Sequence, residues 1–248
     1  LHGIAIREMD TSTGPVDYML FVDGKACGVI EAKKDGVSLG GVAEQSGRYS
    51  LSSSAFTQRW LDDLPFTYES SSLEIRFCDY RDPKARSRNV FHFHKPETLK
   101  KWLEEENTLR ARMHYLPELN TDGLRDCQID AITGIEDSLK KNKPRALLQM
   151  ATGSGKTFTA VTQIYRLAKY AKAKRVLFLV DRGNLGRQAK KEFEQYDTPL
   201  DGRKFTSHYN VNLLGTTGVA DTTKVTISTI QRLYSQLSGT ELDDDADE

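Results

Sequence analysis

The sequence predicts an α/β protein with two domains in series, a mixed-sheet domain followed by part of a parallel-sheet domain. Three observations support this prediction. Residues 1–95 contain short runs rich in β-branched and aromatic residues. After residue 123, apolar segments alternate with helix-like segments, which is the pattern of a parallel sheet. A Gly-rich stretch, MATGSGKT, follows one such apolar segment. We therefore expect domains at 1–95 and 124–248, joined by a connecting helix and linker at 96–123.

The first domain is expected to be mainly β. Its predicted strands share β-branched and aromatic residues, and they cover residues 2–8, 16–22, 26–33 and 72–80. A charged helix is expected at 97–107, because Pro96 is tolerated in the first helical turn. Residues 116–123, LPELNTDG, have the composition of a linker.

The second domain is expected to alternate strands and helices. The predicted helices are 124–141, 156–172, 184–196 and the end of 225–237. The predicted strands are 145–150, 175–180, a short one near 205–209 and the start of 225–237. The tail ELDDDADE is an acidic run that we expect to be solvated.

Composition limits the class of protein. Hydrophobic residues make up 38% and charged residues 28% of the 248 positions, which suits a globular protein. The formal net charge is zero, so any DNA contact would depend on local basic patches. The three cysteines form no CxxC pair, and no apolar run approaches the roughly 18 residues of a membrane helix. The first residue is Leu1 and not Met, so we expect a piece of a longer protein.

MATGSGKT (150–157) has the features of a phosphate-binding loop. Its glycines let backbone N–H groups close around phosphate oxygens, and the following helix adds its dipole. Lys156 would reach the β and γ phosphates, and Thr157 would hold Mg²⁺. Met150 stands where the motif usually has its first glycine, and a chance Gly-rich turn is the alternative. We expect ATP and Mg²⁺ as cofactors, bound by Thr152, Gly153, Ser154, Gly155, Lys156 and Thr157.

LRDCQ (124–128) precedes this loop. The amide of Gln128 offers a donor and an acceptor in one plane, which suits the edge of an adenine. Gln128 is therefore the candidate adenine contact, with Arg125 beside it. The alternative is a solvated residue on a helix face.

GPVDYMLFVDGKACGVIEAKK (14–34) predicts a hairpin with acids and lysine at its open end. Side chains alternate along a strand, so Glu31 and Lys33 share one face. Two carboxylates on one face can hold Mg²⁺, which polarises a phosphodiester and activates water. A nearby lysine can stabilise the developing charge. Asp17, Glu31 and Lys33 are the candidate catalytic residues, and an ordinary surface ion pair is the alternative.

The register of the hairpin tests this hypothesis. A simple two-residue loop at Asp23 and Gly24 would pair Asp17 with Ile30 and turn it away from Glu31. A bulge or a three-residue loop would pair Asp17 with Glu31 on one face. The metal-site hypothesis predicts the second register.

Three further groups of residues have spacings or charges that suggest a role. Gln45 and Tyr49 lie four apart and would share a helix face. Lys84 and Arg86, in RDPKARSR, are candidate DNA contacts, although this run also fits a solvated loop in which Arg81 pairs with Asp79 or Asp82. His92 and His94 alternate along an expected strand, and without a third ligand they predict a polar strand face, not a metal site.

LRDCQ, MATGSGKT, VLFLVDRGNLGRQ and VTISTIQRL together resemble the first motor domain of superfamily 2 helicases and translocases. The resemblance implies a RecA-like P-loop fold and DNA contacts at Arg182, Thr229 and Gln231. Alternatively, Arg182 caps a turn and Thr229 ends a strand. The Asp-Glu-x-His box and second lobe of such motors are absent from this sequence, so we expect the fragment to bind ATP without being a competent ATPase.

The order Asp17…Glu31-Ala32-Lys33 resembles the PD-(D/E)xK nucleases, and EQSGRY resembles the QxxxY motif of their RecB-like branch, which assigns Gln45 and Tyr49 to the same site. With the motor motifs behind it, the chain resembles the restriction (R) subunit of Type I restriction-modification enzymes. The resemblance implies Mg²⁺-dependent cleavage of double-stranded DNA, coupled to ATP-dependent translocation. It implies methylation and specificity subunits as partners, a prokaryotic cytoplasmic location and no membrane. Glu8 is a further acid that could join the site.

Two alternative functions stay open. One is another helicase-nuclease, of a Type III-like or DNA-repair kind. The other is a nucleotide- or DNA-binding module without catalysis, in which Asp17, Glu31 and Lys33 only brace the fold. The DNA recognition sequence, the cleavage distance and the subunit stoichiometry do not follow from this sequence.

Overall fold

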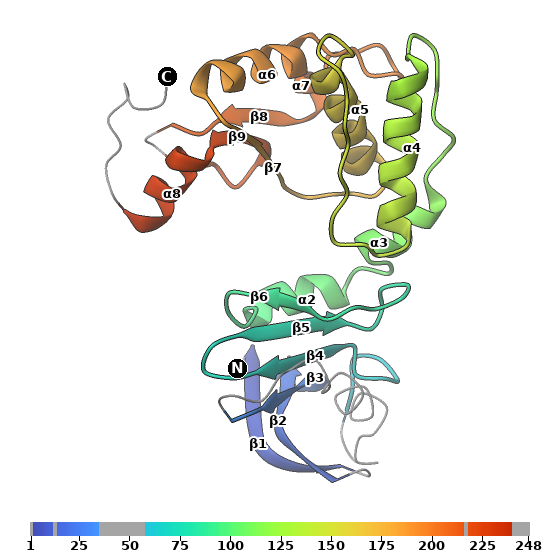
Figure 1. The fold of residues 1–248 in the computed structure, drawn as a ribbon. Helices are drawn as coiled ribbons and strands as arrows, with labels where there is room; N and C mark the ends of the chain where they lie inside the picture. Colours follow the sequence, from blue (N-terminus) through green and yellow to red (C-terminus); the bar gives the residue numbers. More distant parts are fainter. Residues whose placement is uncertain (1, 12–13, 35–57, 216–217, 240–248) are drawn as a thin grey trace. The chain divides into compact units, whose positions relative to one another are not determined.

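The computed structural model describes residues 2–11, 14–34, 58–215 and 218–239. It divides into two compact units, residues 1–111 with 140–142, and residues 112–139 with 143–248. Among the described residues, the first unit contains a six-stranded sheet and the second a three-stranded sheet (Figure 1). The mixed α/β class that the sequence predicts is therefore present, and each unit is described by itself below.

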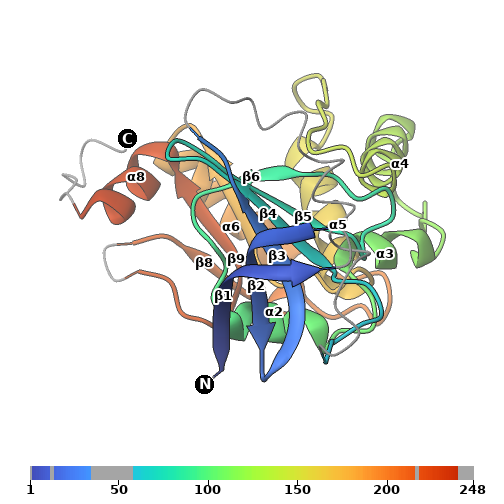
Figure 2. The same ribbon diagram turned by 90° about the horizontal axis from the view of Figure 1, so that it is seen from below.

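The sheet of the first unit has the strand order β1-β2-β3-β4-β5-β6 (Figure 1), and Figure 2 gives a second view of these strands from below. Strands β3 and β4 pair in parallel, and all other neighbouring pairs are antiparallel. The strands are β1 (Gly3–Thr11), β2 (Gly14–Val22), β3 (Lys25–Ala32), β4 (Phe66–Ser70), β5 (Ile75–Asp79) and β6 (Arg88–Val90). The sheet is mixed, as predicted.

Strand β4 was not predicted from the sequence. Residues Phe66 to Glu69 alternate between apolar and polar types, but the strand has only five residues, and four of them are buried in the structure. It lies in the middle of the sheet between β3 and β5. The strand expected over 91–94 is wrong, because His92 and His94 follow β6 in irregular structure. Strand β6 ends at Val90 instead.

Helix α2 (Pro96–Leu103) covers the apolar face of this sheet. The helix ends at Leu103, four residues before the predicted end at residue 107. Leu99 and Leu103 are buried against Phe66 and Tyr68 of β4 and Phe77 of β5. The aromatic rings of Phe66 and Phe77 also pack around the indole of Trp102 in the same helix. The opposite face also has an apolar part, since Met19 and Val29, which lie two residues from Asp17 and Glu31 along their strands, are fully buried in a second cluster.

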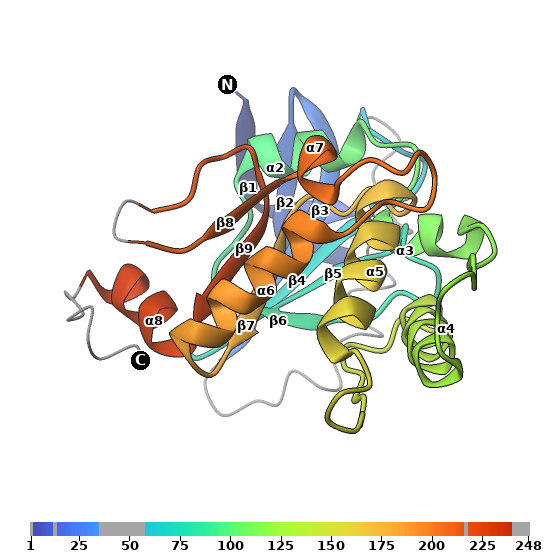
Figure 3. The same ribbon diagram turned by 90° about the horizontal axis from the view of Figure 1, so that it is seen from above.

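The second unit contains a parallel sheet in the order β7-β9-β8, with α6 packed against all three strands (Figure 3). Its strands are β7 (Val176–Val180), β8 (Asn210–Leu213) and β9 (Thr223–Thr229). Helix α3 (Leu109–Arg112) falls where the first unit ends in the sequence. The helices that follow it are the 3₁₀ helix Met113–Tyr115, α4 (Asp126–Lys140), α5 (Lys156–Lys169), α6 (Gly183–Gln195), α7 (Phe205–His208) and α8 (Ile230–Ser238). Among these described helices, none has the length and apolar character that a membrane crossing requires.

Two predictions for the second unit are wrong. Residues 145–150, RALLQM, do not form a strand, since no described strand pairs with them, and Leu147 is 93% exposed. An apolar run becomes a strand only where a neighbour satisfies its backbone groups. Residues 205–208 form α7, and the strand expected there begins two residues later at Asn210.

A buried ion pair fixes the start of the second unit. Arg166 of α5 donates from Nε to Oε1 of Glu136 in α4 at 2.6 Å, and both side chains are buried. The same guanidinium donates to the carbonyl oxygens of Pro117 and Glu118. The predicted linker is thereby held against α4 and α5, because a buried cation is stable only when its hydrogen bonds are filled.

We predict that Gly28→Ala destabilises the first unit by about 1–3 kcal/mol, the usual result of overpacking. A Cβ at Gly28 would lie 2.5 Å from the carbonyl oxygen of Phe66 on the parallel partner strand. Urea unfolding followed by tryptophan fluorescence measures this unit, since both tryptophans, Trp60 and Trp102, belong to it. Gly134→Ala, on an open face of α4, is the control and should leave this transition in place. An unchanged midpoint for Gly28→Ala would contradict the close β3–β4 approach.

Candidate functional site

The hairpin of β2 and β3 contains a bulge that sets the register of its acids. Phe21 pairs with Ala26, but Leu20 pairs with Gly28, so Cys27 is the extra residue. Beyond the bulge Tyr18 pairs with Ile30, and the same register places Asp17 opposite Glu31. This is the register that the metal-site hypothesis requires, and it arises although the loop itself has only two residues.

The end of the hairpin brings Asp17, Glu31 and Lys33 together. Oδ2 of Asp17 accepts a hydrogen bond of 2.7 Å from the backbone N–H of Ala32. Nζ of Lys33 donates to Oε2 of Glu31 at 3.3 Å. The lysine side chain is 22% exposed and the glutamate side chain only 5%. The three predicted residues therefore form one cluster, with the lysine on its wetter side.

Glu31 is held in an unfavourable place for a charge. Burial raises the pKa of its carboxyl above the usual range, and the negative charges of Asp17 and Glu69 raise it further, while Lys33 opposes them. Its Oε1 is buried and has no hydrogen-bond partner among the described residues. A buried carboxylate oxygen without a partner is costly, so a site of this kind calls for a cation.

A divalent metal fits this cluster through the two carboxylates of Asp17 and Glu31. Mg²⁺ takes hard oxygen ligands and is commonly held by one or two carboxylates, with water and phosphate oxygens completing its shell. Within the described ranges, no group of three or more His, Cys, Asp or Glu side chains is arranged to hold a metal ion. The donor set therefore matches a Mg²⁺ shared with substrate better than a closed structural site.

Two predicted residues of this site, Gln45 and Tyr49, lie outside the described residues, so their prediction stands as made. Glu8 is described, and it has a left-handed backbone with φ of 52°. Its carboxylate pairs with Arg7 at 3.0 Å and is 70% exposed. Glu8 is thus occupied by a surface ion pair in this structure.

Sequence reasoning missed Glu69, the residue of β4 that pairs directly with Glu31. It is only 3% exposed, and its charge raises the pKa of Glu31. Glu69 is visible in the sequence as the acid of FTYES. It could be assigned to the site only if those residues were known to form the strand next to β3.

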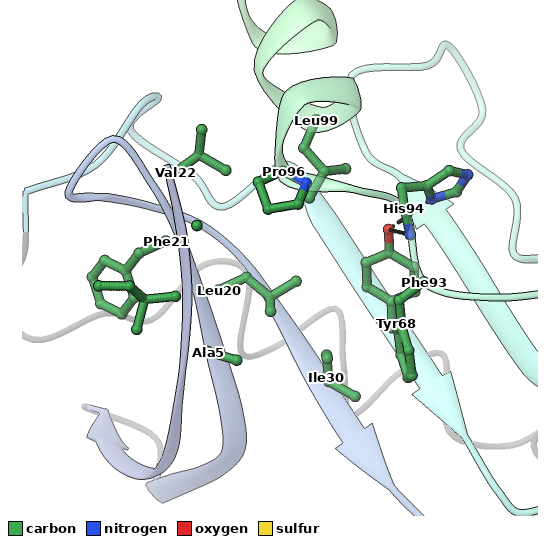
Figure 4. A pocket seen from close by; sticks show the side chains of 12 residues that line it. Ala5, Leu20, Phe21, Val22, Ile30, Tyr68, Phe93, His94, Pro96 and Leu99 are labelled. Carbon is green, nitrogen blue, oxygen red and sulfur yellow. Dashed lines mark hydrogen bonds between the residues drawn. The ribbon is translucent and has the colours of Figure 1, made fainter. Parts of the chain in front are cut away.

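An apolar pocket of about 190 Å³ lies on the other face of the same sheet, between β1, β2 and α2 (Figure 4). Its lining is mostly aliphatic and aromatic. The polar group in it is the Tyr68 hydroxyl, which is bonded to Nδ1 of His94 at 2.7 Å. Burial raises the pKa of Tyr68 and lowers that of His94, so both groups stay neutral at pH 7. This pocket lacks the ionised groups that phosphodiester chemistry needs.

The phosphate loop has the backbone that its glycines predict. Gly153 and Gly155 have φ of 78° and 83°, a region that residues with a Cβ rarely adopt. Gly155 caps α5, which then begins at Lys156. Nζ of Lys156 donates to the carbonyl oxygens of Ala151 at 3.1 Å and Met150 at 3.5 Å. The loop thus presents a helix N-terminus and one cation together, which suits a phosphate group.

Gln128 and Arg125 hold the loop from α4 and the turn before it. Nε2 of Gln128 donates to the carbonyl of Ser154 at 3.1 Å, and its Oε1 accepts from the N–H of Arg125. Nη1 of Arg125 donates to the carbonyl of Gly153 at 2.8 Å. A Cβ at Gly155 would lie 2.4 Å from the Gln128 amide. Both residues therefore brace the loop, and the adenine contact of Gln128 stays a prediction.

Arg182, Thr229 and Gln231 follow the carboxyl ends of neighbouring parallel strands. Val180, the last residue of β7, pairs with Thr229, the last of β9. Arg182 and Gln231 are exposed just beyond this edge, where ligands bind in open α/β sheets. Thr229 is buried, and its hydroxyl accepts from the N–H of Arg232 to cap α8. The side chain of Thr229 therefore has a structural role at the end of its strand, as the alternative to a DNA contact supposed.

The basic run after β5 contains two kinds of side chain. Arg81 is structural, because it forms two hydrogen bonds with Asp79 and stacks over Phe66. Lys84 and Arg86 are exposed, and no ion pair is recorded for them among the described residues. They are the members of the run that remain available to a polyanion.

Two family models match the chain. Residues 2–64 match the second domain of the endonuclease subunit of the Type I restriction enzyme EcoKI. Residues 121–248, more than half of the chain, match the family described as the res subunit of Type III restriction enzymes. These matches define the class as a restriction-enzyme subunit with a helicase-like domain.

Individual relatives narrow the class. The EcoKI endonuclease subunit of Escherichia coli (strain K12) is 31% identical over 90% of this chain and 22% of its own length. The EcoAI endonuclease subunit of Escherichia coli is 39% identical over 35% of this chain and 11% of its own length. A solved fragment of a type I restriction enzyme subunit from Vibrio vulnificus YJ016 covers 91% of this chain and 39% of that chain, at 16% identity and a TM-score of 0.29.

The chain belongs to the endonuclease subunits of Type I restriction enzymes. It spans about a fifth of the EcoKI subunit and about a ninth of the EcoAI subunit, which are the first curated relatives that it matches.

We predict that Glu31→Gln stabilises the metal-free first unit at neutral pH by about 0.5–2 kcal/mol, as replacement of a strained site residue often does. The raised pKa means that the folded state favours the neutral carboxyl. The neutral carboxyl stabilises the folded state fully when the pH is below 4.5, the ordinary pKa of a glutamate. This stabilisation is lost as the pH rises through the raised pKa of Glu31 in the folded state. The advantage of Glu31→Gln should therefore grow from pH 4 to pH 7.

Urea unfolding at several pH values, with and without Mg²⁺, measures this effect. Mg²⁺ should stabilise the natural chain and leave Glu31→Gln unaffected, since only a carboxylate pair binds it. Glu74→Gln, in the exposed turn before β5, is the matched control. A Glu31→Gln variant that is less stable than the natural chain at pH 7 would contradict this account of the site.

Proposed function

We propose that this chain contributes a Mg²⁺-dependent DNA-cleavage site and an ATP-binding site to a Type I restriction endonuclease. The observation that supports the first site is the bulged register, which gathers Asp17, Glu31 and Lys33 around a buried carboxylate oxygen without a partner. The resulting reaction is hydrolysis of a phosphodiester of double-stranded DNA.

Each residue has a distinct part in the proposed cleavage. Asp17 and Glu31 would hold Mg²⁺, which when bound polarises the phosphodiester and lowers the pKa of water. Ala32 fixes the Asp17 carboxylate through its backbone N–H, so the ligand is pre-oriented. Lys33 reaches the wetter side of the cluster, where its ammonium can stabilise the charge that develops on the phosphate. Gln45 and Tyr49 are proposed to support this site.

The second site is the phosphate loop, for which we propose ATP with Mg²⁺. Lys156 would exchange its bonds to loop carbonyls for oxygens of the β and γ phosphates, and Thr157 would hold the metal. Gln128 and Arg125 fix the loop and lie where an adenine contact is proposed. Thr152, Gly153, Ser154 and Gly155 complete the loop.

In the whole enzyme, ATP hydrolysis is proposed to drive DNA translocation past methylation and specificity subunits in the bacterial cytoplasm. Arg182, Gln231 and the backbone near Thr229 are proposed DNA contacts of the motor. Lys84 and Arg86 are proposed contacts of the nuclease part, since exposed cations exchange counterions for phosphates. The Type III match concerns only residues 121–248, and the match of residues 2–64 favours the Type I assignment.

We expect Lys33→Ala to abolish plasmid cleavage while leaving ATP hydrolysis intact. The assay uses the full-length subunit assembled with its partners and follows both activities side by side. Loss of charge stabilisation of this kind usually costs about 10²–10³-fold in rate. Lys34→Ala, which removes the adjacent exposed lysine, is the matched control and should cut normally. Normal cleavage by Lys33→Ala would mean that the cluster is structural and that DNA is cut elsewhere.

ATP affinity tests the second site in this chain itself. Lys156→Ala should weaken ATP binding about 10- to 100-fold, the loss expected for charge-assisted hydrogen bonds to phosphate. Isothermal titration calorimetry with Mg²⁺-ATP measures the Kd directly. Lys169→Ala, in the last turn of the same helix, should bind like the natural chain. Equal affinity for both variants would reject the loop as the nucleotide site.

A further inference from the structure

Polar side chains form a row across the face of the first sheet that carries Asp17 and Glu31. The register pairs Glu31 of β3 with Glu69 of β4, Glu69 with Arg76 of β5, and Arg76 with Asn89 of β6. Directly paired residues point to the same side of a sheet, so all of them share the face of Asp17 and Glu31. The row runs from the proposed metal site to the edge strand β6.

Arg76 is the cation of this row. Its Nε is buried and has no hydrogen-bond partner in the structure, and no ion pair is recorded for Arg76 among the described residues. The residue as a whole is partly exposed. A guanidinium held at a surface with a buried donor unused is costly unless something binds there. The neighbouring Asn89 is exposed and adds a second polar group.

The position of Arg76 relative to Glu31 suits one partner. Two strand spacings, roughly 10 Å, separate the backbones of Glu31 and Arg76. That span exceeds a single phosphate group, but a DNA strand bound at Asp17 and Glu31 has further phosphates on either side. Arginine presents donors in a planar fork that matches phosphate oxygens.

We propose that Arg76 binds a backbone phosphate next to the one that is cut, and so aligns the DNA strand across the sheet. The inference rests on the proposed cleavage site, and it names a substrate-binding residue for that site. Asn89 lies one strand further along the same path, toward the edge at β6.

A purely structural role for Arg76 is the competing explanation. In that case Arg76 only offsets the charge of Glu69, which lies opposite it and is 3% exposed. The two roles differ in one respect. A counter-charge becomes unnecessary when Glu69 is neutralised as well, whereas a phosphate contact does not.

The experiment measures single-turnover DNA cleavage and DNA-stimulated ATP hydrolysis by the assembled full-length enzyme. Arg76→Gln should lower the cleavage rate about ten- to hundredfold with ATP hydrolysis unchanged. The slope of log rate against log salt concentration should fall by about one, as expected for one lost phosphate contact. Arg76→Lys should recover part of the rate. Arg7→Gln removes an exposed charge on the other face of the sheet and is the matched control.

The double variant Arg76→Gln with Glu69→Gln separates the two roles. A double variant that stays as slow as Arg76→Gln supports the phosphate contact. Restored cleavage in the double variant, or normal cleavage by Arg76→Gln alone, overturns it. If Arg76→Gln loses ATP hydrolysis and fails to assemble, the same two activities are measured for Arg76→Lys instead, and this variant tests the proposal. Reduced cleavage with full ATP hydrolysis then supports the proposal, and normal cleavage or joint loss of both activities overturns it.

Glu31→Gln is measured in parallel to keep the two hypotheses apart. If it cuts DNA normally, the proposed cleavage site is wrong and the inference falls with it. If it is inactive and Arg76→Gln cuts normally with a normal salt dependence, only the role of Arg76 is rejected.

Discussion

One extra residue in the second hairpin strand governs the candidate nuclease site. The bulge at Cys27 shifts the pairing of β2 and β3 by one position, which turns Asp17 to the face of Glu31. The bulged residue does not disturb the fold, because Cys27 is fully buried in the apolar cluster with Val22 and Phe66. The same hairpin with a regular ladder would place the two carboxylates on opposite faces, and no shared metal would be possible.

The two faces of the sheet in the first unit carry different kinds of side chains. Its apolar face packs Phe66, Tyr68 and Phe77 against α2 and provides the core. Its other face has a smaller apolar cluster with Met19 and Val29, and beside this cluster lies the buried Glu31 with an unused oxygen, which the fold alone would not favour. Buried like charges of this kind persist where function requires them, since a bound cation removes the penalty. The second unit follows a similar division, because a buried Arg166–Glu136 pair braces the helices while the loop at Lys156 stays accessible.

Sequence patterns predicted more of the candidate site than of the sheet around it. The metal-site hypothesis required Asp17 and Glu31 to share a face, and that requirement predicted a bulge or a longer loop but could not choose the bulged residue. Strand β4 was missed although Phe66 to Glu69 alternate between apolar and polar types, because a run of five residues gives only a weak local signal. With β4 missing, Glu69 had no predicted neighbour. The segment 145–150 failed for a related reason, since strand formation depends on a pairing partner that local sequence does not reveal.

We propose that Asp17 and Glu31 bind one divalent metal together. Crystals of this chain soaked in Mn²⁺, a hard cation that replaces Mg²⁺ at oxygen ligands, would test it by anomalous diffraction. The account predicts an anomalous peak within coordination distance of both carboxylates, close to Oε1 of Glu31. A peak confined to other sites, with the Glu31 carboxylate unliganded at saturating Mn²⁺, would contradict it.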